Sequence, residues 1–441
     1  MSLQERVDPH LLKGALATVK TLHDQGHEAY FAGGAVRDLL LEKSISEIDI
    51  ATSASPQEIE QLFPKTIPVG KQFGVMIVVQ DTNDYEVTTF RKEGDYVDGR
   101  HPTQVSFTDA KHDVQRRDFT VNALFLNPFT EEVLDYVKGR EDLERKLIRT
   151  VGPSPLRFQE DKLRLLRALR LACQLDFEIE SHTYQQVKEH ASQLTQVSWE
   201  RIRDEVLKIL TGLDPSRGLK LLFDSGILEV ILPEVAAMHG VEQPPEFHPE
   251  GDVLVHTRLM FEISQERSET LSLAILLHDV GKPPTFVVKE RIRFDGHADL
   301  GAKMAEKICR RLRISNQQIE EVVDLVKDHL RFIHVQEMRE STLKRFLRKP
   351  NFRDHLELHR LDSLASHGNL SSYHFCREKL EELSQEAMRP KPLINGHDLI
   401  RMGLEPGPIF SEIMSAIEDF QLEGKLSSKE ETLDWVKKHY L

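Results

Sequence analysis

The sequence predicts an α+β protein with an N-terminal α/β head followed by helical domains. Short runs rich in β-branched and aromatic residues alternate with turns between Glu28 and about Pro128, which is typical of strands. From about Gly139 the composition becomes helical. A chain of 441 residues has room for about three domains. The expected strands are Ala29–Ala32, Ile45–Ala51, Val75–Gln80, Tyr85–Phe90, Val105–Phe107 and Ala123–Asn127.

We expect four parts along the chain. The predicted divisions are a head at 1–137, a helical neck at 138–222, a second helical domain at 223–385 and a C-terminal helical tail at 386–441. A helix over 10–25, with apolar residues at helical spacing, should pack on the sheet of the head.

The composition limits the partners and the compartment. Basic side chains number 58 and acidic ones 72, so contacts with nucleic acid should be local and not driven by a global positive field. Cys173, Cys309 and Cys376 lie far apart, which predicts neither disulfides nor a thiolate zinc site and fits a reducing cytoplasm. The apolar run around Leu271–Leu277 is too short to cross a bilayer, so no membrane association is expected.

The segment Phe31–Leu40 carries the first candidate site. Gly33 and Gly34 allow a sharp backbone turn that opens a helix over Ala35–Leu41, and amide groups at such a turn can approach a polyanion. The segment therefore predicts a triphosphate site, although two glycines before a helix are also a common turn.

Two acidic residues follow on a predicted strand. Glu47 and Asp49 are two residues apart within Ile45–Ala51, so their carboxylates should share a face. A divalent cation such as Mg²⁺ relieves the repulsion between such carboxylates. The alternative is a solvated strand edge.

Together these segments resemble the nucleotidyltransferase signature of the class II tRNA nucleotidyltransferases and bacterial poly(A) polymerases. In that family a Gly-Gly-x-Val-Arg-Asp segment precedes an Asp-x-Asp metal site. The resemblance implies a polymerase-β-like head in which Arg37 helps to hold the triphosphate and Glu47 and Asp49 hold Mg²⁺. Glu47 departs from the family pattern, and its longer side chain must shift the metal or bend.

A third acidic residue is a candidate on a neighbouring strand. Glu86 lies in Tyr85–Phe90 on the same predicted face as Thr88. It is either a further metal-site carboxylate or a surface residue. Between Lys92 and Asp113 a polar stretch with glycines reads as a loop that gates an active site.

The string Arg116–Leu124 alternates charged and apolar residues. Arg117 can present its guanidinium to phosphate, and Asp118 or Asn122 can bond a ribose hydroxyl. A solvated surface is the alternative, but the string resembles the family's ribose-recognition motif.

The neck contains a candidate for base selection. Over Phe158–Ala172 the spacing predicts one helix with an apolar face and a basic face. Its polar residues of interest are Glu160, Asp161, Arg164, Arg167 and Arg170. Cytosine and adenine each present an amine beside a ring nitrogen, so Asp161 and Arg164, three apart on the helix, can pair with either. An ordinary salt bridge is the alternative; resemblance to the family's base-recognition motif favours selection, with Glu160 orienting the pair.

Another helix should support the neck. This helix begins at Ser198, which takes the first position of a capping box. The fourth position, where glutamate would be ideal, is Arg201.

A second constellation lies further along. His256, His278-Asp279 and Asp362 resemble the His…His-Asp…Asp pattern of HD-domain metal proteins. The resemblance implies a second divalent metal, Ni, Mn, Fe or Zn, and a bound water for phosphoester hydrolysis. His297 and His329 are placed where some HD proteins hold another metal.

The stretch Ser341–Lys349 is basic and amphipathic. It predicts a local contact for an RNA backbone, or a solvated helix face.

The resemblance spans essentially the whole chain and implies an RNA nucleotidyltransferase that adds C, C and A to tRNA 3′ ends from CTP and ATP. The alternatives are an A-adding or poly(A)-synthesising enzyme, and an HD-type phosphohydrolase with an impaired head. The sequence leaves the oligomeric state open.

Overall fold

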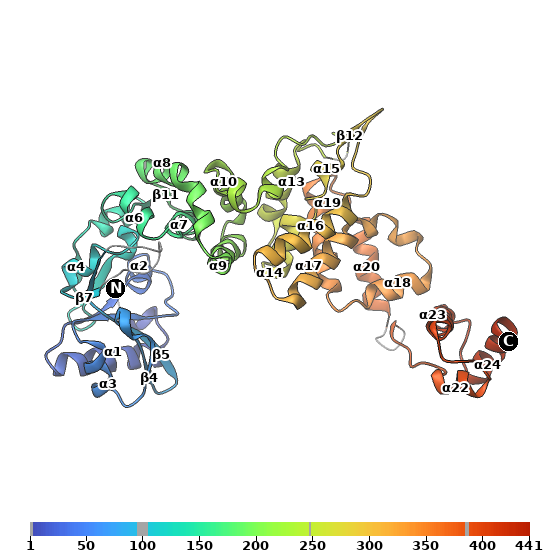
Figure 1. Cartoon of the computed structure of the whole chain (residues 1–441), viewed down its shortest axis with the longest axis horizontal. Helices are drawn as coiled ribbons and strands as arrows, with labels where there is room; N and C mark the ends of the chain where they lie inside the picture. The colour runs from blue at the N-terminus through green and yellow to red at the C-terminus, as the bar shows by residue number, and fades with distance from the viewer. Residues whose placement is uncertain (1–2, 95–104, 247, 384–387) are drawn as a thin grey trace. The chain divides into compact units, whose positions relative to one another are not determined.

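The computed structural model describes residues 3–94, 105–246, 248–383 and 388–441. The chain forms two compact units, Met1–Pro233 and Glu234–Leu441 (Figure 1). The expected head and neck both fall in the first unit. The boundary expected between 222 and 223 lies inside helix α10 (Pro215–Asp224), whereas the contacts divide the chain after Pro233.

The head is built on a mixed seven-stranded sheet with strand order β3-β4-β5-β2-β1-β8-β9. All neighbours are antiparallel except β2 and β5, which run parallel. The predicted strands are all present, with shifted ends in several cases, and β3, β6 and β9 were not predicted. The strands of this sheet are β1 Ala29–Ala32, β2 Asp49–Thr52, β3 Thr66–Gly70, β4 Val75–Gln80, β5 Asn83–Thr89, β8 Leu124–Leu126 and β9 Val133–Asp135.

The remaining strands form two-stranded sheets. They are β6 Arg91–Glu93 with β7 Val105–Phe107, β10 Leu147–Ile148 with β11 Glu178–Ile179, and β12 Val287–Val288 with β13 Ile292–Arg293. Part of the loop expected between Lys92 and Asp113 is the hairpin β6–β7, and its residues 95–104 lie outside the described residues.

Helix α1 (Pro9–Asp24) packs on the sheet, as its apolar spacing predicted. The Tyr85 hydroxyl from β5 donates a hydrogen bond to the Leu11 carbonyl at 2.8 Å. A β-carbon at Gly14 would lie 2.4 Å from that hydroxyl oxygen, so only glycine permits this close approach. The helices of the head are η1 Leu3–Glu5, α1, α2 Gly34–Leu40, α3 Pro56–Leu62, η2 Lys71–Phe73, α4 Ala110–Val114, η3 Thr120–Asn122 and α5 Gly139–Glu144.

The neck differs from the sequence prediction at one important point. The single helix expected over Phe158–Ala172 is broken, because Asp161 has extended backbone angles, φ −144° and ψ 107°. Helix α6 therefore ends at Glu160 and α7 begins at Arg164. The helices here are α6 Ser154–Glu160, α7 Arg164–Leu175, α8 Ser181–His190, η4 Ala191–Gln196, α9 Trp199–Leu210, α10 and α11 Ile227–Ile231, and α12 Pro233–Ala236 follows at the boundary.

The second unit is almost entirely helical. One apolar cluster, centred on Phe332 and Phe346, lies between η5, α18, α19 and α20. Another, around Leu399 and Ile413, holds the C-terminal helices together. The helices are α13 Val253–Ile263, α14 Glu269–Leu277, α15 Lys282–Thr285, α16 His297–Arg311, α17 Asn316–Asp328, η5 His329–Glu337, α18 Glu340–Leu347, α19 Phe352–Ala365, α20 Ser371–Glu382, α22 Gly396–Arg401, α23 Pro408–Leu422 and α24 Lys429–Tyr440.

The basic helix α18 is not the free cationic face that the sequence suggested. Arg345 and Arg348 both pair with Glu418 of α23, each at 2.7 Å. Lys344 is buried and donates to the Leu422 carbonyl at 2.6 Å. Glu418 therefore balances the charges of Arg345 and Arg348, and α23 covers part of this face. The RNA contact expected for Ser341–Lys349 stays a prediction.

Among the residues that the structure describes, no helix combines the length and the apolar character needed to cross a membrane.

Candidate functional site

An open pocket of about 550 Å³ in the first unit gathers residues from both the head and the neck. Its predicted members come from segments far apart in sequence. They are Gly33, Gly34, Arg37, Glu47, Asp49, Arg117, Asp118, Asn122, Asp161, Arg164, Arg167 and Arg170. The fold thus brings the separate candidate motifs to one cavity.

The glycine turn lies at the edge of this pocket. Gly33 has φ +66°, a backbone angle that favours glycine, and it is the N-cap residue of α2, which begins at Gly34. A β-carbon at Gly33 would lie 3.7 Å from Arg117 Nη1 and 3.9 Å from Asp49 Oδ2. The missing side chain therefore leaves open the space between the arginine and the carboxylate.

The acidic residues converge, although not as one strand. The strand predicted over Ile45–Ala51 was too long, because the β1–β2 ladder ends at the pair Ala32–Asp49. Glu47 therefore lies in the connection before β2. The parallel register that pairs Ile50 with Val87 places Asp49 beside Glu86.

The environment of Asp49 disfavours its negative charge. Burial, the neighbouring Glu86 and, more weakly, Glu47 raise the pKa of Asp49 to about 6, against the lowering effect of Arg117. Glu86 and Asp49 also line an adjoining cavity of about 190 Å³ with Arg116 and Arg117. Carboxylates that repel one another beside a cavity are suited to a divalent cation.

The arginines of the pocket are held by specific partners. Arg37 is buried, forms two hydrogen bonds of 2.8 Å with Asp38, and donates to Asn122 Oδ1 at 2.7 Å. Arg117 lies over the Phe125 ring at 4.8 Å. Fixed guanidinium groups of this kind are suited to a polyphosphate.

Asp118 links the head to the neck. Its Oδ2 accepts from Arg167 Nε at 2.8 Å. Burial raises the pKa of Asp118, but the guanidinium groups of Arg167 and Arg164 outweigh burial and lower it to about 2. An ionised carboxylate with free acceptor positions can still accept from a ribose hydroxyl.

The base-recognition candidates have different partners from those expected. Asp161 accepts from Arg201 Nη2 at 2.7 Å and Nη1 at 3.2 Å, and Arg164 donates to Glu160 at 2.6 Å. The prediction that Asp161 and Arg164 are neighbours on one helix was wrong, because the chain is extended at Asp161. Both nevertheless line the pocket, while Glu160 contacts Arg164 from outside its lining.

Arg201 is a pocket residue that sequence reasoning missed as a functional one. Its only signal was its place in α9, where a capping box would have glutamate. Ser198 indeed makes no side-chain cap bond there. The remaining arginine of the basic face, Arg170, donates to Glu205 Oε2 at 2.6 Å.

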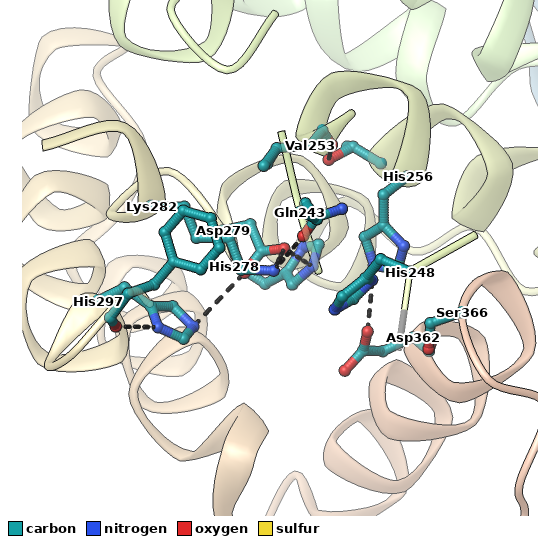
Figure 2. Close-up of polar contacts among 12 residues, drawn as sticks. Gln243, His248, Val253, His256, His278, Asp279, Lys282, His297, Asp362 and Ser366 are labelled. Atoms are coloured by element: carbon teal, nitrogen blue, oxygen red, sulfur yellow. Dashed lines mark hydrogen bonds and ion pairs between the residues drawn. The ribbon is translucent and has the colours of Figure 1, made fainter. Parts of the chain in front are cut away.

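In the second unit the HD candidates also come together. Nε2 of His256 in α13 lies 3.1 Å from Oδ1 of Asp362 in α19, and Figure 2 shows both side chains in this cluster. His278 follows α14, and one ligand atom from each of these residues falls within a 4.8 Å cluster. His278 Nε2 lies 3.1 Å from Asp279 Oδ2, yet it makes no hydrogen bond to any residue that the structure describes. A buried donor set with an unsatisfied imidazole nitrogen fits a divalent metal.

A second cluster adjoins the first. Asp279 Oδ1 lies 3.6 Å from His297 Nε2 and 3.9 Å from His329 Nε2, and the two imidazoles are 3.3 Å apart. Burial lowers the pKa of His329 to about 4, so its ring is neutral and available as a ligand near neutral pH. His297 and His329 therefore lie together beside Asp279, and their role as metal ligands stays a prediction.

Glu250 and His248 of this site had no signal of their own in the sequence, whereas Lys282 closes the motif His278-Asp279-Val280-Gly281-Lys282. Glu250 Oε1 lies 2.7 Å from His256 Nδ1 and 2.9 Å from His248 Nδ1. Lys282 Nζ lies 2.7 Å from Asp279 Oδ2 and 2.6 Å from Gln243 Oε1 (Figure 2). Burial raises the pKa of Glu250, but its close contacts with the His248 and His256 rings bring it down to about 2.

Comparison with known proteins agrees with this arrangement. Family models match residues 29–149 (poly A polymerase head domain), 176–238 (probable RNA- and SrmB-binding site of polymerase A) and 251–365 (HD domain). The chain is 33% identical over 425 residues to a CCA-adding enzyme of Anoxybacillus flavithermus, covering 96% of each. It is 45% identical over 216 residues to one of Bacillus pumilus, covering 49% of this chain and 54% of the relative.

A solved structure extends the comparison. The crystal structure of the Bacillus stearothermophilus CCA-adding enzyme in complex with CTP matches with a TM-score of 0.73 and 27% identity, covering 98% of each chain. The similarity therefore includes the head, the neck and the second unit.

Proposed function

This chain belongs to the family of CCA-adding enzymes, and we propose how its residues add C, C and A to the 3′ end of tRNA. It is a nucleotidyltransferase like the CCA-adding enzymes it resembles, and we assign it CTP, ATP and tRNA as partners, the molecules bound in solved structures of CCA-adding enzymes. We base the residue roles on one observation. The glycine turn, the acidic residues, the arginines and the neck candidates all line one pocket.

We assign the transfer chemistry to the acidic edge of the pocket. Glu47 and Asp49 would hold Mg²⁺, with Glu86 as a further carboxylate beside Asp49. A magnesium ion bound there would neutralise phosphate charge and assist deprotonation of the tRNA 3′ hydroxyl. The raised pKa of Asp49 supports this assignment, because burial first and then the neighbouring Glu86 and Glu47 destabilise its charge, and a cation bound there would offset both effects.

The basic residues position the nucleotide. Arg37 and Arg117 hold the triphosphate, with its α-phosphorus facing the 3′ hydroxyl for in-line attack and with pyrophosphate leaving. Asp118, kept ionised by Arg167, accepts from the ribose.

Asp161 and Arg164 select the base. The amine of cytosine or adenine donates to Asp161, and the ring nitrogen accepts from Arg164. Uracil and guanine present a carbonyl where the amine is needed, so they leave the carboxylate facing an acceptor. Arg201, which also lines the pocket, holds the Asp161 carboxylate with two hydrogen bonds.

An incorporation assay tests these roles. tRNA lacking its 3′ end is incubated with labelled CTP and ATP, singly and together, and Asp161→Asn is compared with Asp204→Asn, an exposed residue of α9 outside the pocket. We expect C then A from the unaltered protein and reduced selectivity from Asp161→Asn only. Unchanged selectivity in Asp161→Asn would show that Asp161 takes no part in base recognition. If the unaltered protein adds A but no C, it is an A-adding enzyme.

A second activity is supported by the HD cluster. Asp279, His297, His329 and Asp362 open onto a pocket of about 1340 Å³. We propose that His256, His278, Asp279 and Asp362 bind a divalent metal that would supply an activated water for phosphoester hydrolysis. Metal content by elemental analysis and hydrolysis of a cyclic phosphate test this, and a metal-free, inactive second unit would refute it.

The chain divisions at 1–137, 138–222, 223–385 and 386–441 stand as our proposal for its domains. We also propose a cytoplasmic location. The free, buried state of Cys173, Cys309 and Cys376 supports it, because disulfides are rare in that compartment.

A further inference from the structure

Asp113 is a buried carboxylate directly behind the nucleotide pocket. It lies in α4 with no exposed surface. Its Oδ1 accepts from the Arg91 backbone N–H at 3.1 Å and from Arg116 Nε at 2.8 Å, and its Oδ2 accepts from Arg117 Nε at 3.1 Å. Burial raises its pKa, but the two guanidinium groups lower it more. It is therefore an anion that two neighbouring cations share.

These contacts decide which way Arg117 faces. Asp113 engages Nε and Nη2 of Arg117, each at 3.1 Å, and the Phe125 ring supports the guanidinium plane. Nη1 is left facing the glycine turn, 3.7 Å from where a Gly33 β-carbon would be. A long, flexible side chain is thus fixed with one donor directed into the pocket.

Arg116 connects Asp113 to the neck. Its guanidinium is held by Asp113 at 2.8 Å, and its backbone carbonyl accepts from Arg164 Nη2 at 3.0 Å. Arg164 is the proposed base-reading guanidinium. A chain of contacts therefore runs from Asp113 through Arg116 to Arg164.

We propose that Asp113 is a positioning residue for nucleotide transfer. It holds Arg117 in the orientation that receives the triphosphate, and through the Arg116 carbonyl it keeps Arg164 in place for base selection. This inference rests on the proposed function, which assigns the triphosphate to Arg117 and the base to Arg164.

The test compares Asp113→Ala and Asp113→Asn with Asp142→Asn in the full-length protein. Asp142 is equally buried in the head, but it accepts from Thr120 and Arg149 and does not line the pocket. For each protein we measure kcat and KM for CTP and ATP on tRNA lacking its 3′ end, the incorporation of UTP, and the thermal midpoint.

We expect Asp113→Ala to raise the KM for CTP and ATP about 10- to 100-fold, from the loss of charge-assisted hydrogen bonds. UTP incorporation should rise as well. Asp113→Asn keeps one acceptor oxygen and should fall in between. Asp142→Asn should lower the thermal midpoint while leaving KM and base selectivity unchanged.

These measurements distinguish a positioning role of Asp113 from a purely structural one. Wild-type KM and selectivity in folded Asp113→Ala would overturn the proposal, and so would equal effects of Asp113→Ala and Asp142→Asn, which would show a structural role alone. If Asp113→Ala does not fold, Asp113→Asn decides by the same criteria. Failure of the unaltered protein to add C and A would refute the proposed function instead.

Discussion

Arg201 and Asp161 form a two-pronged ion pair across the neck, with nitrogen to oxygen distances of 2.7 and 3.2 Å. The pair joins α9 to the extended residue between α6 and α7. Asp161 lies outside a helix, and the Leu163 backbone N–H donates to its Oδ1 at 3.0 Å. Arg201 adds a second, charged contact from another helix.

We predict that Arg201→Ala impairs base selection. Loss of a paired, charged hydrogen bond costs about 1.5–3 kcal/mol, so kcat/KM for CTP and ATP should fall about 10- to 100-fold. Steady-state incorporation with each nucleotide measures this. UTP and GTP should be discriminated less well.

The matched control is Arg203→Ala on the same helix. Arg203 pairs with the adjacent Asp204 at 2.7 Å and does not line the pocket. Equal losses in both variants would assign the effect to helix α9 as a whole and not to the Asp161 contact.

The Asp118–Arg167 pair predicts a specific pH dependence of stability. The pKa of Asp118 falls from 3.8 to about 2 on folding. Its ionised form therefore stabilises the fold above pH 4 by about 2 kcal/mol, and this contribution is lost as pH falls from about 4 to 2. Asp118→Asn should have a flatter stability curve in that window, measured by urea unfolding at each pH.

A double-mutant cycle isolates this contribution. In an Arg167→Met background, Asp118→Asn should change the slope much less, because the principal partner is gone. A slope that is the same in both backgrounds would contradict the prediction.

Glu250 should tune the HD site through His256. Its carboxylate fixes the Nδ1 side of the ring, which leaves Nε2 facing Asp362. Loss of such an outer contact lowers metal affinity by about 10- to 100-fold. Calorimetric titration of Glu250→Gln with Mn²⁺ or Ni²⁺ checks this, while CCA addition should remain intact.

Glu242→Gln serves as its control, since Glu242 is exposed on the same segment and carries the same charge. Identical affinities for Glu250→Gln and Glu242→Gln would refute the role of Glu250.

Helix α23 should detach more easily when its ion pairs are removed. Arg345→Gln with Arg348→Gln removes both contacts to Glu418. Hydrogen exchange in α23 should then accelerate, and in the unaltered protein it should accelerate with added salt, which screens exposed ion pairs. Exchange that is unchanged in the double variant would show that the apolar contacts alone hold this helix.

The sequence could predict the residues that carry their own pattern. Gly33, Gly34 and the acidic pair stand within one short segment, and His278-Asp279 forms a recognisable string, so each was found before the fold was known. Strands β1, β2, β4, β5, β7 and β8 were predicted for the same reason, since alternation is a local signal, whereas β3, β6 and β9 were missed.

Other features depend on contacts between distant segments and leave no local pattern. The break at Asp161 was missed because the apolar spacing runs through it unchanged. Arg201 and Glu250 act on partners that only the fold brings near. The covered face of α18 was missed because its partner, Glu418, is far along the chain.

Lys282 has a consequence for how the second unit tolerates metal scarcity. Its ammonium lies 2.7 Å from Asp279 Oδ2, and both residues are buried. The lysine therefore balances the charge of the aspartate without a metal ion. Small domains whose folding free energy comes from metal binding unfold when the ion is withdrawn. Here the helical core should stay folded through depletion and reload when the ion returns.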